Sequence, residues 1–122
     1  MIQSIRFVGV RTDAVEAMSA LFGDLLGAET VEKHGGGTRF RAADGAAFDV
    51  YPADDPDHDF FGTGPVVGFR VDDFAAARAR MIAAGIAFLG EPQRAGGAIW
   101  NHFVGPDRNV YEIIGADPDG AS

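Results

Sequence analysis

Two pairs of side chains are spaced so that they could do chemistry. The first lies around segment 103–114, which reads Phe-Val-Gly-Pro-Asp-Arg-Asn-Val-Tyr-Glu-Ile-Ile, a strand, a turn and a strand. A three-residue hairpin loop with Arg108 in the left-handed position places His102 opposite Glu112. A histidine that faces a carboxylate can act as an acid–base pair, for instance in proton abstraction beside a carbonyl. It can equally form a simple ion pair or hydrogen bond.

The second pair comes from an earlier copy of the same segment. Shifted back by 63 positions, it falls on residues 40–51 without a gap. Gly45 takes the left-handed position in this copy, and the register places Arg39 opposite Asp49. A two-residue turn would slip the pairing by one residue and reverse the faces. The longer loop is preferred because the two copies should share a geometry, and each hairpin then has one apolar face.

Each hairpin is preceded by a strand and a helix. Residues 5–11 and 66–72 alternate as strands do, and apolar stripes at helical spacing follow them. The first helix is expected to begin at an Asp13 cap, to bury Leu25 and Leu26 as the end of its stripe, and to stop at Gly27. The second is capped by Asp72 or Asp73 and runs to Gly85. Short strands at 29–33 and 86–89 and a loop at 91–97 complete the pattern.

The pattern predicts one α+β domain of two β-α-β-β-β modules. Module 1 covers about residues 1–52 and module 2 about 66–115, with a short C-terminal tail at 116–122. The connector, 52–65, is rich in Asp and Pro, and we expect a solvated linker rather than a metal loop. Its Phe60 and Phe61 could add stacking surface.

The composition limits the function classes. The 122 residues carry a formal charge of −8, which argues against nucleic acid as a partner and favours a cationic or neutral small molecule. Apolar runs are too short to cross a membrane. The absence of cysteine and of a visible signal peptide favours a cytoplasmic location.

The repeat resembles the vicinal oxygen chelate superfamily, which includes glyoxalase I, extradiol dioxygenases and bleomycin-resistance proteins. The motifs that carry the resemblance are Val10-Arg11-Thr12-Asp13, Leu25-Leu26-Gly27 and segment 105–112, Gly-Pro-Asp-Arg-Asn-Val-Tyr-Glu. It implies two modules that form an incomplete barrel around a cavity. In metal-dependent members, side chains from the first and last strands of each module hold the ion.

Those metal positions fall here on Phe7, Asp49, Val66 and Glu112. Phe7 and Val66 have no lone pair to offer, and two carboxylates alone make a poor transition-metal site. No metal or other cofactor is therefore predicted. If a metal binds, Asp49 and Glu112 are its candidate ligands, with His102 as a possible substitute.

The resemblance also predicts which side chains line the cavity. A mixture of aromatic rings and paired charges suits a planar or cationic ligand. The predicted ligand-binding residues are Phe7, Arg39, Asp49, Tyr51, Trp100, His102 and Glu112.

Two functions follow from this lining. The first is sequestration of a small molecule without metal, as in bleomycin-resistance proteins that confer antibiotic resistance. The alternative is a glyoxalase- or dioxygenase-like isomerase, lyase or oxygenase that uses Asp49, Glu112 and His102, with Glu112 and His102 as the catalytic candidates. In either case a homodimer is expected, because apolar residues remain for a two-fold contact and the modules can pair within or across chains.

Overall fold

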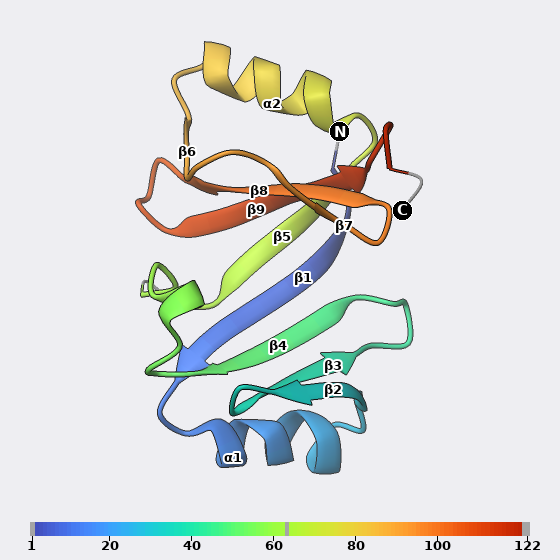
Figure 1. Cartoon of the computed structure of the whole chain (residues 1–122), viewed down its shortest axis with the longest axis vertical. Helices are drawn as coiled ribbons and strands as arrows, with labels where there is room; N and C mark the ends of the chain where they lie inside the picture. The colour runs from blue at the N-terminus through green and yellow to red at the C-terminus, as the bar shows by residue number, and fades with distance from the viewer. Residues whose placement is uncertain (1, 63, 121–122) are drawn as a thin grey trace. The chain divides into compact units, whose positions relative to one another are not determined.

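The computed structural model describes residues 2–62 and 64–120, which form two compact units. One unit is Phe7–Val66, and the other is Met1–Arg6 with Val67–Ser122. Each unit combines an open sheet with helical segments, so the α+β class is confirmed (Figure 1).

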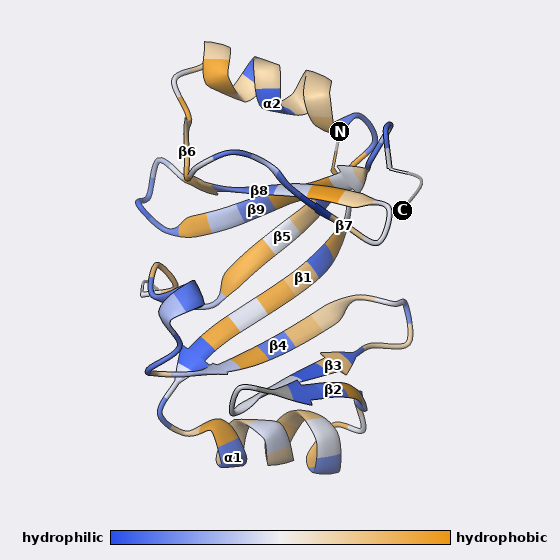
Figure 2. Ribbon diagram, in the orientation of Figure 1, coloured by the Kyte–Doolittle hydropathy of each residue, from blue (hydrophilic) through white to orange (hydrophobic). Residues whose placement is uncertain are grey.

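The first unit contains the β-α-β-β-β pattern of the first module. Its strands lie in the order β2-β3-β4-β1, with β1 parallel to β4 and the other neighbours antiparallel. Edge strand β2 is exposed and mostly hydrophilic (Figure 2), which discourages pairing with another sheet. The elements are β1 (Ile2–Thr12), whose residues from Phe7 on belong to this unit, α1 (Val15–Ser19), the π-helix η1 (Ala20–Leu25), β2 (Glu29–His34), β3 (Gly37–Arg41), β4 (Ala47–Pro52) and the short 3-10 helix η2 (Pro56–His58).

The second unit repeats this pattern with one extra strand. Its strands lie in the order β5-β9-β8-β6, and β7 pairs with β8 within segment 91–97, where we expected a loop. Strand β7 forms because the chain after it folds back as a hairpin into β8, with Gly96 and Gly97 at positive φ. The elements are β5 (Val66–Val71), α2 (Phe74–Ala83), β6 (Ala87–Phe88), β7 (Gln93–Ala95), β8 (Ala98–Val104) and β9 (Val110–Ala116).

The predicted hairpin registers are confirmed in both units. Arg108 has φ of 71° and Gly45 has φ of 88°, the left-handed conformation that a three-residue loop requires. His102 lies opposite Glu112 on β8 and β9. In the first unit, Arg39 lies opposite Asp49 on β3 and β4.

The first helical segment differs from the prediction at both ends. Asp13 does not cap it, because Ala14 occupies the N-cap position and the Ala14 amide bonds to the Thr12 hydroxyl. The second half widens into a π-turn, closed by the Leu26 amide on the Leu21 carbonyl. A π-turn rotates the residues after it away from the α-helical face. The expected burial of Leu25 and Leu26 is therefore wrong, since they are 76% and 69% exposed.

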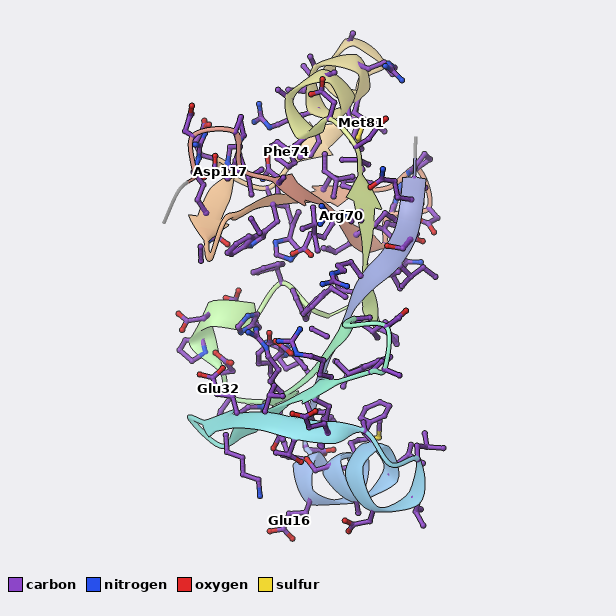
Figure 3. All side chains as sticks on the ribbon, turned by 90° about the vertical axis from the view of Figure 1, so that its right-hand side faces the viewer. Glu16, Glu32, Arg70, Phe74, Met81 and Asp117 are labelled. Carbon is purple, nitrogen blue, oxygen red and sulfur yellow. The ribbon has the colours of Figure 1, made fainter. Side chains whose placement is uncertain are left out.

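Helix α2 packs against the sheet of the second unit as predicted. The Asp73 carboxylate caps it by accepting a hydrogen bond from the Ala76 amide. Phe74 and Met81 extend from the helix toward the sheet (Figure 3) and pack with Ile99 and Ile113. No helix within the described ranges is long and apolar enough to cross a membrane.

Candidate functional site

The predicted histidine–carboxylate pair exists in the second unit. His102 Nε2 lies 3.0 Å from Glu112 Oε2, and the two side chains are only 12% and 6% exposed. Strand alternation places both side chains on the face of the sheet opposite Phe103 and Ile113, which belong to the core under α2. The pair therefore lies on the other face from the core, as the sequence predicted.

Trp100 lies on the same face as His102, two residues earlier on β8. Its indole Nε1 donates a 2.9 Å hydrogen bond to Gln93 Oε1 on β7. The unpredicted strand β7 thus fixes the orientation of the Trp100 ring. Trp100, His102 and Glu112 together form the polar face of the second unit.

The first unit holds a more tightly bonded carboxylate. Arg39 donates two hydrogen bonds to Asp49, from Nε to Oδ1 at 2.8 Å and from Nη2 to Oδ2 at 2.6 Å. The Tyr51 hydroxyl donates a third, to Oδ2 at 2.6 Å. Asp49 is 3% exposed, so this bidentate pair and the phenol supply the hydrogen bonds that a buried carboxylate needs. Glu32 on β2 (Figure 3) places its Oε2 4.0 Å from Arg39 Nη1, the guanidinium nitrogen that does not bond to Asp49.

The electrostatics of this cluster keep Tyr51 neutral and Arg39 charged. Burial raises the pKa of Tyr51, and the Asp49 carboxylate raises it further by charge and hydrogen bonding. The hydrogen bond to Asp49 raises the pKa of Arg39, an effect that burial partly opposes. The phenol therefore stays a hydrogen-bond donor, and Arg39 stays the counter-ion of Asp49.

The connector contributes a residue that the sequence analysis did not select. The His58 imidazole stacks on the Tyr51 ring, with centroids 3.6 Å apart and 10° between the planes. Its Nδ1 lies 3.0 Å from Asp55 Oδ2. Asp55 also caps η2 through the Asp57 amide, and Pro56 occupies the first turn. The Asp55-Pro56 dipeptide, a cap followed by proline, is the signal that could have revealed this turn.

Phe61 anchors the end of the connector. It is 3% exposed and meets Tyr51 edge-on at a centroid distance of 5.7 Å. Its ring also lies 6.5 Å from that of Phe7. Both rings pack so closely over Gly9 that a Cβ there would lie 2.7 Å from each. The expected exposure is confirmed for most of the connector, including Asp54, Asp57 and Asp59, but Phe61 packs in the interior.

The donor set does not fit the metal that many superfamily members hold. Phe7 and Val66 offer no lone pairs, and Asp49 is engaged by Arg39 and Tyr51. Within residues 2–62 and 64–120, no three His, Cys, Asp or Glu side chains gather into a group that could bind a metal ion. Transition metals need about four such ligands or three with an open position.

The structure thus brings the predicted residues together in two groups. Arg39, Asp49 and Tyr51 meet in the first unit, and Trp100 and the His102–Glu112 pair share one face in the second. Phe7 contacts Phe61. The residues that sequence reasoning missed are Gln93, Asp55 and His58.

Comparison with known proteins identifies the family. The model of the Glyoxalase/Bleomycin resistance protein/Dioxygenase superfamily matches residues 4–121, so the chain belongs to that superfamily. The comparison with curated proteins gives no match.

Solved structures share the fold at low sequence identity. The Mn(II)-bound glyoxalase from Novosphingobium aromaticivorans is 23% identical with a TM-score of 0.74, over 93% of this chain and 39% of that one. Methylmalonyl-CoA epimerase from Mycobacterium tuberculosis is 16% identical with a TM-score of 0.69, over 97% and 91% of the two chains. A halotolerant catechol dioxygenase is 20% identical with a TM-score of 0.69, over 98% and 42%. At these identities the likeness establishes the fold and not the activity.

Proposed function

We propose that this protein binds a planar or cationic small molecule without a metal ion, and sequesters it in the manner of bleomycin-resistance proteins. One observation carries the proposal. Two of the four family metal positions are Phe7 and Val66, and a third, Asp49, is held by Arg39 and Tyr51. These side chains offer a metal ion few available lone pairs, which supports a metal-free ligand site on the family scaffold.

Charge and ring surface support a cationic or planar ligand. The formal charge of −8 favours cations in general. Trp100 offers a flat ring on the same face as the buried Glu112 carboxylate, and aromatic faces and carboxylates together suit aromatic cations. The ligand would gain from stacking on Trp100 and from the negative charge of Glu112.

Fluorescence of Trp100, the only tryptophan, tests this proposal directly. The titrants are bleomycin and proflavine, a planar cation, with fluorescein as a planar anion. We expect a cation to quench or shift the emission at micromolar concentration, and Glu112→Gln to weaken its binding more than Glu91→Gln, an exposed loop control. If neither cation changes the emission, or if fluorescein binds equally well, the proposal loses its support.

A metal-free enzyme is the second candidate, favoured by the buried His102–Glu112 pair. Two titratable groups 3.0 Å apart can share and transfer a proton, as abstraction beside a carbonyl requires. Asp49 is less available for this role because three hydrogen bonds engage it. The test is deuterium incorporation from D₂O into a panel of thioesters and α-hydroxy ketones. Incorporation that both Glu112→Gln and His102→Gln abolish would establish the enzyme and displace the binding proposal.

A further inference from the structure

A shallow, open cavity lies on the face of the second unit opposite His102 and Glu112. Its volume is about 440 Å³. Phe103 and Tyr111 alternate along β8 and β9 with His102 and Glu112, so their side chains point the other way. The cavity is therefore distinct from the polar face that the proposed function uses. Its lining consists of Phe69, Phe103, Gly105, Pro106, Asp107 and Tyr111.

Three nearly parallel rings form the wall of this cavity. Tyr111 lies between the other two, with centroid distances of 6.2 Å to Phe69 and 5.8 Å to Phe103. The interplanar angles are 25° and 27°. Gly105 permits this arrangement, because a Cβ there would lie 2.9 Å from the Tyr111 ring. The result is an aromatic surface next to the turn that joins β8 to β9, the turn being visible in Figure 1.

In the first unit, the rings equivalent to Phe103 and Tyr111 are covered by another aromatic side chain. Phe40 and Phe48 are the first-unit equivalents of Phe103 and Tyr111, at the 63-residue shift. There the ring of Phe22 covers both, with centroids 5.9 and 5.7 Å away.

Helix α2 carries no ring at the position that Phe22 has in the first unit. The strand and helix repeat at a shift of 59 residues, which aligns Phe22 with Met81. Met81 packs instead against the core under α2. The ring of Phe88 on β6 lies 5.7 Å from that of Phe103 at 57°, much as Phe22 lies on Phe40, so the part of the slot that belongs to the cavity is the part beside Tyr111.

Asp107 places a negative charge at the rim of the cavity. Its Oδ2 accepts hydrogen bonds from the Tyr111 hydroxyl at 2.7 Å and from Asn109 Nδ2 at 3.0 Å, and its Oδ1 accepts one from the Asn109 amide. These donors, Tyr111 first, hold the pKa of Asp107 below its ordinary value. All three donors are neutral, so the carboxylate keeps its charge.

We propose that this cavity is a binding site for a planar aromatic cation, whose ring lies beside Tyr111, as that of Phe22 lies beside Phe48 in the first unit, and whose charge lies against Asp107. The ring would lie on Tyr111, with Phe69 and Phe103 at its edges. Aromatic surface and a carboxylate together favour a cation over a neutral or anionic ring.

NMR titration with benzamidine, a planar aromatic cation, tests the site, and benzoate is the matched anion. We expect benzamidine to shift the amide resonances of Gly105 and of residues 107–111, with a dissociation constant on the order of 1 mM or below, which is typical of so small a ligand. Asp107→Asn should weaken binding about threefold, since exposed charge pairs have modest energies. Phe69→Val introduces the residue type that Val10 has at the equivalent position of the first unit, and it should weaken benzamidine binding by a similar factor.

The matched control is Asp44→Asn. Asp44 is the first-unit equivalent of Asp107 and accepts a hydrogen bond from the Ala46 amide in the same way, but its slot is filled by Phe22. This variant should bind benzamidine as the wild type does. The proposal is overturned if benzoate binds equally well or if the shifts fall only on residues 98–102. It is also overturned if resonances 105–111 change with protein concentration alone, which would mean that a second copy covers the surface.

Discussion

The imidazole of His58 lies flat on the ring of Tyr51, with 3.6 Å between their centroids. Because Tyr51 also donates to Asp49, this stack links the connector to the buried ion pair of the first unit. Phe61 closes the same cluster from the end of the segment. The connector is therefore part of the packed structure that surrounds Asp49.

Replacement of His58 by alanine should loosen the connector. We expect the free energy of unfolding to fall by about 1 kcal/mol, from loss of the ring stack and of the contact with Asp55. Urea unfolding measures this, with Asp59→Ala as a control in the same segment at an exposed position. Equal stability of the two variants would show that the stack contributes nothing.

Replacement of Arg39 by methionine should destabilise the first unit, because it leaves the Asp49 carboxylate buried without its counter-ion. Arg39 is 40% exposed, so water can partly compensate, and we expect a loss of about 2 kcal/mol. Asp49→Asn in the same chain should recover part of this loss. Arg41→Met, an exposed arginine on the same strand, is the control. Strictly additive effects of the Arg39 and Asp49 changes would contradict the pairing.

Deprotonation of Tyr51 should lower the stability of the folded protein at alkaline pH. Its folded-state pKa is raised by burial and by Asp49 from the ordinary value of 10.0, so the folded state keeps the proton that the unfolded state loses. The stabilisation is complete below about pH 10 and declines as the pH rises above it. Unfolding measured between pH 8 and 11 should show this decline, and Tyr51→Phe should reduce it.

Tyr111 is the only other tyrosine and provides the comparison. Its hydrogen bond to Asp107 also raises its pKa, but burial is the leading cause only at Tyr51. Tyr111→Phe should therefore leave most of the alkaline decline in place. A decline that persists in full in Tyr51→Phe would show that Tyr51 is not its source.

We predict a homodimer that buries the exposed leucines at the end of η1. Leu25 and Leu26 are adjacent and largely exposed, and such apolar surface suits a two-fold contact. Light scattering should give about twice the chain mass of 12.8 kDa, and Leu25→Glu should halve it. Leu89→Glu, at a less exposed leucine, should leave the mass unchanged. A wild-type mass of 12.8 kDa would contradict the dimer.

The sequence predicted the hairpins well because their register depends on local chemistry. Arg108 and Gly45 fix the left-handed loop position, and the apolar face of each hairpin then allows one register only. The pairs His102–Glu112 and Arg39–Asp49 follow from that register. This part of the candidate site needed no tertiary information.

The rest of the site depends on contacts between distant segments. The π-turn after Ser19 leaves no periodic signature, so the helical stripe misplaced Leu25 and Leu26. The stack of His58 on Tyr51 exists only once the connector folds onto the sheet. Local patterns in an acidic, proline-containing segment resemble those of any solvated loop.

We predict that this member of the superfamily holds no metal ion, and elemental analysis of protein purified without chelator tests this most directly. We predict less than about 0.1 equivalent of Mn, Fe, Ni, Zn or Cu per chain, because the donor set lacks the three or four ligands such ions need. We also predict that Glu112→Gln will not change this content. One equivalent of metal in the wild type that is lost in Glu112→Gln would contradict the account.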